Sequence, residues 1–127
     1  MPLTALDHYT VKTTDIEKTA QFYEEILDME RGPMPALDFP ILWLYAGGKP
    51  VLHIVGRDKV EATDGGLIDH VAFRATGYAG IKAKLTERQV EHQEQCLPEI
   101  GLHQIFAKCD DGTWVELIFD PAEVTAD

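Results

Sequence analysis

Four residues that could bind a metal ion occur at equivalent places in two halves of the sequence. His8 stands at the head of the alternating segment LDHYTVK, and His70 stands at the head of IDHVAF, 62 positions later. His53 lies in PVLHIVG, and Glu116 lies in TWVELI, 63 positions later. Imidazole and carboxylate together suit Fe, Ni, Zn, Mn or Co. The sequence therefore predicts one divalent metal ion with His8, His53, His70 and Glu116 as candidate ligands.

Taken singly, each of these residues also has a structural explanation. A lone histidine on a strand is more often a hydrogen-bonded core residue or a surface residue than a ligand. Glu116 is harder to explain in that way, because it stands between Val115 and Leu117. A buried carboxylate without a partner is costly, so Glu116 needs a cation or hydrogen-bond donors.

The same order of predicted strands and helix, which must position these residues, occurs in both halves of the sequence. Alternation and turn residues predict a strand, a helix and three further strands in each half. The expected strands and helices, in order, are 5–12, a helix from a capping box at Thr14 and Glu17 to about 27, a loop or irregular strand at 31–40, 41–48 and 50–56, then 67–76, a helix at 78–90, 91–99, 103–109 and 113–120. We expect an α+β fold of two βαβββ modules in a single domain, 1–127, with module one at about 4–56, a linker at 57–66 and module two at about 67–121.

Strand parity adds residues that could line a pocket around the four candidates. Residues two apart on a strand share a face, so Thr10 shares the side of His8, and Arg74 that of His70. On the strand next to Glu116, the set with Gln104 and Phe106 corresponds to a set with Trp43 at the offset of 63. The predicted substrate-binding residues are Thr10, Trp43, Arg74, Gln104 and Phe106. His92 and His103 have no counterparts, so we expect them at the surface or in loops, with His103 a further candidate for a substrate contact.

Composition narrows the class of protein. The chain has 127 residues, of which 45% are apolar, enough for one core. The net charge of -11 argues against nucleic acid as a partner. No apolar run approaches a membrane span, and no signal-peptide pattern opens the chain, so we expect a cytoplasmic protein without a membrane partner. Cys96 and Cys109 lack CxxC spacing and are expected to be free thiols.

Three stretches, DHYTVKTTDIEKTAQFYEEILDM, IDHVAF and CDDGTWVELIFDP, resemble the vicinal oxygen chelate superfamily, which includes glyoxalases, bleomycin-resistance proteins and extradiol dioxygenases. The resemblance implies a half-open β-barrel of paired βαβββ modules around one metal ion, and commonly a homodimer in which the site can be shared between chains. It implies that His8, His70 and Glu116 are ligands. A fourth ligand is Glu or Gln in the glyoxalase branch, so His53 departs from that pattern.

Two enzymatic chemistries and one binding function stay open on the sequence. If four protein ligands hold the metal, proton transfer next to a carbonyl is favoured, with Glu116 as base and a metal-stabilised enolate or oxyanion, in a lyase or isomerase acting on a small substrate. If His53 stays off the metal, it could be the acid or base, and the remaining two-His, one-carboxylate set is the one used in Fe(II) oxygen chemistry, as in ring-cleaving dioxygenases. The alternative is a drug-binding protein of the bleomycin-resistance kind, without catalysis.

Overall fold

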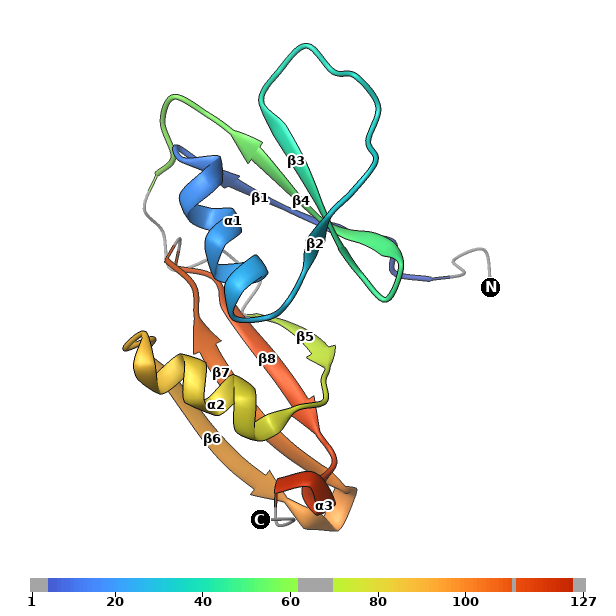
Figure 1. Cartoon of the computed structure of the whole chain (residues 1–127), viewed down its shortest axis with the longest axis vertical. Helices are drawn as coiled ribbons and strands as arrows, with labels where there is room; N and C mark the ends of the chain where they lie inside the picture. The colour runs from blue at the N-terminus through green and yellow to red at the C-terminus, as the bar shows by residue number, and fades with distance from the viewer. Residues whose placement is uncertain (1–4, 62–69, 111, 125–127) are drawn as a thin grey trace. The chain divides into compact units, whose positions relative to one another are not determined.

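Each half of the chain forms a four-stranded sheet with one ten-residue helix (Figure 1). The structure is a computed structural model and describes residues 5–61, 70–110 and 112–124. Two compact units, Met1–Glu61 and Ala62–Asp127, divide the chain inside the predicted linker, of which 62–66 lies outside the described residues. The grouping of both modules into one domain stays a prediction.

The first unit contains β1 (Tyr9–Thr13), α1 (Ile16–Glu25), β2 (Glu30–Arg31), β3 (Ile41–Ala46) and β4 (Lys49–Gly56). The sheet order is β1-β4-β3-β2, with β1 parallel to β4 and the other pairs antiparallel. Gly47 and Gly48 join β3 to β4 with φ of +60° and +78°. Two consecutive positive φ values suit the tight turns that twisted hairpins need, so the predicted Gly-Gly hairpin is confirmed.

The second unit repeats this arrangement with β5 (His70–Arg74), α2 (Tyr78–Glu87), β6 (His92–Leu97), β7 (Leu102–Lys108) and β8 (Trp114–Phe119). A 3₁₀ turn (Pro98–Ile100) follows β6, and the short helix α3 (Pro121–Val124) follows β8. The sheet order β5-β8-β7-β6 matches that of the first unit strand for strand. The prediction of βαβββ in each half is confirmed; positions 67–69 of the predicted strand lie outside the described residues.

The strand registers confirm the duplication residue by residue. In the first sheet His53 pairs with Thr10 on one side and with Trp43 on the other. In the second sheet Glu116 pairs with Ala72 and with Phe106. Ala72 follows Thr10 by 62 positions, and Phe106 follows Trp43 by 63, which are the offsets expected from the sequence.

The core of each unit lies between its helix and one face of its sheet. In the first unit Ala20 and Tyr23 of α1 are fully buried, as are Leu44, Leu52 and Ile54 of the sheet. In the second, Leu85 of α2 is fully buried, together with the sheet residues Ile105, Ala107, Val115 and Phe119. Since side chains alternate along a strand, His53, Trp43, Glu116 and Phe106 belong to the opposite faces of the two sheets.

The predicted capping box of α1 is wrong by one residue. The N-cap is Asp15, whose carboxylate accepts the backbone N–H of Lys18. Thr14 is not the cap, and Glu17 forms an ion pair with Arg31 of β2 instead. Thr, Thr and Asp at 13–15 are all good caps, and the carboxylate at position 15 is the one that reaches the open N–H groups.

Candidate metal centre

In the second unit, Glu116 is the centre of a polar network on the face away from α2. Its side chain is buried, with the residue 6% exposed. His70 Nε2 lies 3.0 Å from Glu116 Oε1, and Gln104 Nε2 donates to Oε2 at 2.8 Å. Gln95 Nε2 in turn donates to Gln104 Oε1 at 2.6 Å. The carboxylate is therefore held on both oxygens, which offsets the cost of its burial.

In the first unit, three aromatic rings form a continuous stack on the face away from α1. The His53 ring lies between His8, with centroids 3.8 Å apart, and Trp43, with centroids 4.2 Å apart. His8 Nδ1 also bonds Asp7 Oδ1 at 2.7 Å, and this hydrogen bond lowers the pKa of Asp7. A carboxylate on one ring nitrogen fixes the orientation of the other, as it does in many metal-binding histidines.

The surroundings of His53 favour its neutral form. Burial lowers the pKa of His53, and the nearby His8 lowers it further, whereas Asp7 and a backbone hydrogen bond at Pro50 act in the opposite direction. His53 Nε2 is buried and has no hydrogen-bond partner within the described residues. A neutral imidazole with a free nitrogen can bind a metal ion or accept a hydrogen bond.

The four predicted ligands divide two and two between the units. Within the described ranges, the structure contains no cluster of three or more His, Cys, Asp or Glu side chains suited to a metal ion. The pair in the second unit does fit part of such a site. In an octahedral site, two neighbouring donors bound to one ion at about 2.1 Å lie about 3.0 Å apart. His70 Nε2 and Glu116 Oε1 have this separation, which is also that of a direct hydrogen bond.

The five predicted substrate-binding residues belong to the same two faces. Phe106 packs edge to face on His70, with ring centroids 5.4 Å apart, and Gln104 is engaged by Glu116 and Gln95. Thr10 and Arg74 are exposed. Trp43 is half-buried on His53, and its Nε1 has no hydrogen-bond partner among the described residues. Their contact with a substrate stays a prediction.

Sequence reasoning missed Gln95, which supports Gln104. The signal was present in strand parity, because Gln95 pairs directly with Gln104 across β6 and β7. The Asp-His repeat similarly pointed to Asp7 as a partner of His8, whereas Asp69 of the second copy lies outside the described residues.

The expectation of a surface or loop position is wrong for His103, whereas His92 keeps part of its surface exposed. His103 is on β7, is 7% exposed and faces α2, opposite to Gln104 and Glu116. Its Nε2 bonds Glu94 Oε2 at 2.7 Å, and Glu94 also accepts Tyr78 Oη at 2.7 Å and pairs with Lys82 Nζ at 2.8 Å. His92 is half-buried at the start of β6 and bonds the Val90 carbonyl. Parity places His103 away from the candidate site.

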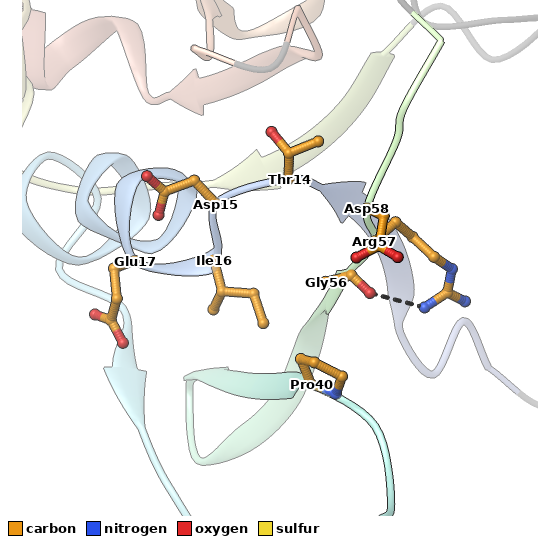
Figure 2. Close-up of a pocket in the computed structure, with 8 residues that line it drawn as sticks. All are labelled: Thr14, Asp15, Ile16, Glu17, Pro40, Gly56, Arg57 and Asp58. Carbon is orange, nitrogen blue, oxygen red and sulfur yellow. Dashed lines mark hydrogen bonds between the residues drawn. The ribbon is translucent and has the colours of Figure 1, made fainter.

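A separate depression of about 520 Å³ lies at the start of α1 (Figure 2). It is lined by residues 14–17 together with Pro40, Gly56, Arg57 and Asp58. None of these is a predicted site residue. Asp15 already caps the helix here, and the Arg57 guanidinium bonds the Gly56 carbonyl. Both are local structural contacts, so this depression is not the candidate centre.

Cys96 is exposed and Cys109 is buried, and neither forms a disulfide within the described residues. Among the helices in the described ranges, none combines the length and the apolar character of a membrane span.

Neither a protein-family model nor a curated protein matches the sequence. Among solved structures, a glyoxylase/bleomycin resistance protein/dioxygenase domain from Frankia sp. EAN1pec matches 93% of this chain and 98% of its own at 16% identity, with a TM-score of 0.76. The fosfomycin resistance protein FosX from Listeria monocytogenes matches 95% and 97% at 18% identity, with a TM-score of 0.72. TnmS3, an antibiotic binding protein from Streptomyces sp. CB03234, matches 94% and 97% at 20% identity, with a TM-score of 0.69. The chain therefore has the paired βαβββ fold of the glyoxalase/bleomycin resistance/dioxygenase proteins, the vicinal oxygen chelate superfamily that its motifs resemble.

Proposed function

We propose that this protein is a divalent-metal-dependent enzyme that acts on a small substrate, with lyase or isomerase chemistry. His8, His53, His70 and Glu116 are the proposed ligands of the metal ion, and four protein ligands favour proton transfer over oxygen chemistry. The two units supply these residues either within one chain or across a homodimer.

One observation carries the proposal. His53 and Glu116 occupy the same position in two equivalent sheets, and each is buried on the face away from its helix. Glu116 is paired with His70 and Gln104, whereas the buried His53 Nε2 has no partner among the described residues, so its burial is costly unless it serves a ligand. The spacing of His70 Nε2 and Glu116 Oε1 suits two ligands of one ion, and the free Nε2 of His53 suits a further contact.

A metal ion bound by these residues would polarise adjacent oxygen atoms of the substrate. Gln104, supported by Gln95, holds Oε2 of Glu116, and the other oxygen, Oε1, lies 3.0 Å from His70 Nε2. Phe106 packs edge to face on the His70 ring, and Trp43 stacks on the His53 ring. Glu116 or His53 then moves the proton next to the carbonyl.

The reaction class is tested by two parallel assays on metal-loaded protein. The first follows deuterium incorporation from D₂O next to the carbonyl of hemithioacetals and acyl thioesters, and the second follows oxygen uptake with catechols under Fe(II). Exchange without oxygen uptake, absent in Glu116→Gln and retained in the exposed control Glu87→Gln, supports the lyase or isomerase class. Oxygen uptake with catechols would instead establish the ring-cleaving dioxygenase.

Drug binding without catalysis is the second candidate. The net charge of -11 and the fold shared with the antibiotic binding protein TnmS3 favour it. Such a protein has no need of the His70–Glu116 pair. Tight binding of a cationic glycopeptide antibiotic by both the parent and Glu116→Gln, with neither reaction detectable, would favour this class.

A further inference from the structure

The two sheets differ at one equivalent edge. β2 and β6 occupy the same place, at the end of the strand order in the first and the second sheet. β2 has only two residues, the exposed and charged Glu30 and Arg31, and Pro33 follows shortly after it. Short edge strands, exposed charges and proline are common means of preventing a sheet edge from pairing with another chain. The edge of the first sheet is therefore protected.

The strand β6 has none of these protecting features. It has six residues, HQEQCL, of which the central ones are exposed. Its register with β7 runs from His92 to Leu97 without a shift, so the strand has no bulge. It contains no Lys, Arg or Pro, and Pro98 comes only after its last residue. Among the described residues, no strand pairs with the outer side of β6, which lies at the margin of its sheet (Figure 1).

The backbone groups at this open edge belong to His92, Glu94 and Cys96. Lys108 donates its backbone N–H to the carbonyl of Glu91 at 2.9 Å, which makes these two residues a hydrogen-bonded pair in register with the β6–β7 ladder. Hydrogen-bonded and non-hydrogen-bonded pairs alternate along antiparallel strands. The odd-numbered residues of β6 therefore turn their N–H and C=O groups to β7, and the even-numbered residues turn theirs outward.

The one acidic side chain of β6 is neutralised within its own unit. Glu94 pairs with Lys82 Nζ at 2.8 Å and bonds both His103 Nε2 and Tyr78 Oη at 2.7 Å. A second strand at this edge would therefore meet little uncompensated charge, although the chain carries a net charge of -11. Repulsion between more distant exposed charges is largely screened beyond about 8 Å at physiological salt.

We propose that β6 pairs antiparallel with β6 of a second copy of this chain, around a two-fold axis at Glu94. This register places His92 opposite Cys96 of the second copy and the two Glu94 residues opposite each other. Every outward residue of the strand then exchanges both of its backbone hydrogen bonds. A shift by two residues in either direction would leave one outward residue of each strand beyond the end of the other.

The side chains at this edge also suit a second copy. Each Glu94 brings its own Lys82, so the two ion pairs that meet at the axis carry no net charge. On the face away from α2, Gln93 would lie opposite Gln95 of the second copy, and an amide group offers both a donor and an acceptor. A two-fold contact uses the same groups from both partners. The pairing would join two four-stranded sheets into one, and it does not depend on the metal centre.

The test compares Cys96→Pro with Cys96→Ala in reducing buffer. Proline at this edge position removes an outward N–H and leaves the hydrogen bonds to β7 in place. Alanine also lacks the thiol but keeps the N–H, so it is the matched control. Folding of both variants is checked by circular dichroism, and association is measured by sedimentation velocity from about 5 to about 200 µM.

We expect the parent and Cys96→Ala to form dimers as the concentration rises, and Cys96→Pro to associate at least about tenfold more weakly. Amide hydrogen exchange of the parent gives a readout that needs no variant. The N–H groups of His92, Glu94 and Cys96 should exchange more slowly at the high concentration than at the low one, whereas those of Gln93 and Gln95 should be protected at both.

Two results would overturn the inference. The first is a parent that stays monomeric over the whole concentration range. The second is a dimer in which Cys96→Pro associates as tightly as Cys96→Ala and the three outward N–H groups exchange at the same rate at both concentrations. If Cys96→Pro does not fold, the exchange rates of the parent alone decide.

Discussion

Replacing Glu94 with glutamine removes the charge at the centre of the polar network between α2 and its sheet. Partial burial tends to raise the pKa of Glu94, but hydrogen bonds from His103, Lys82 and Tyr78 outweigh it and lower the pKa to about 2. These donors come from α2 and β7, while Glu94 itself is on β6. The carboxylate thus links three elements through one group.

The lowered pKa of Glu94 gives the size of its contribution to the free energy of unfolding. A lowering from 4.5 to about 2 corresponds to at most about 3.4 kcal/mol at neutral pH. The Glu94 side chain is 27% exposed, so screening by solvent reduces the expected contribution to about 2 kcal/mol. Because the folded-state pKa is depressed, the contribution is complete above pH 4.5 and is lost as the pH falls toward 2. Less than half of it should remain at pH 3.

The assay is urea unfolding of the parent and of Glu94→Gln at pH 7, 5, 4 and 3, with the exposed Glu87→Gln as control. We expect the variant to be about 2 kcal/mol less stable at pH 7 and the difference to fall below about 1 kcal/mol at pH 3. Glu87→Gln should stay within about 0.5 kcal/mol of the parent throughout. A difference for Glu94→Gln that is under 0.5 kcal/mol, or that is the same at pH 7 and pH 3, would refute the reasoning.

Three further predictions concern single residues. Glu123 of α3 accepts the backbone N–H groups of Gly77 and Tyr78 and so caps α2, whose own N-cap residue makes no side-chain hydrogen bond. Glu123→Ala should lower the free energy of unfolding, measured in urea, by about 1 kcal/mol. An unchanged free energy of unfolding would show that α3 does not cap α2 in solution. Gly48→Ala should lower the free energy of unfolding by about 1 kcal/mol because the φ of Gly48 is +78°. Gly80→Ala should raise it by about 0.5–1 kcal/mol because Gly80 lies inside α2 with open space for a Cβ. Effects of the same sign would contradict both backbone assignments. Glu116→Gln should leave the chain folded, by circular dichroism, but lower zinc affinity by more than about 100-fold, and unchanged affinity would remove Glu116 from the ligand set.

The repeated pattern made the fold predictable. The offsets of 62 and 63 positions are reproduced in the strand registers, where Thr10, His53 and Trp43 correspond to Ala72, Glu116 and Phe106. A buried face constrains register strongly, since a slip of one residue exposes every core side chain. The same constraint placed the predicted polar residues on the face away from each helix.

Local choices among similar residues were not predictable in the same way. Thr13, Thr14 and Asp15 can all cap a helix, and the sequence does not show that Asp15 is the one that reaches the open N–H groups while Glu17 pairs with Arg31. His103 was misplaced because its partners Glu94 and Tyr78 come from other elements.

The ring stack of His8, His53 and Trp43 depends on rotamers that strand parity does not specify. Parity predicted that these residues share a face, but it does not show that their rings lie face to face.

Metal content measures the central claim most directly. The metal content of protein purified without added metal or chelator is measured by inductively coupled plasma mass spectrometry. The protein is then equilibrated with Fe(II), Ni(II), Mn(II) or Zn(II) and measured again, and His8→Ala is treated in the same way. The account predicts about one metal ion per site in the parent and loss of that ion in His8→Ala with the fold intact. A folded parent that retains no metal under any of these conditions would contradict it and bring the drug-binding function forward.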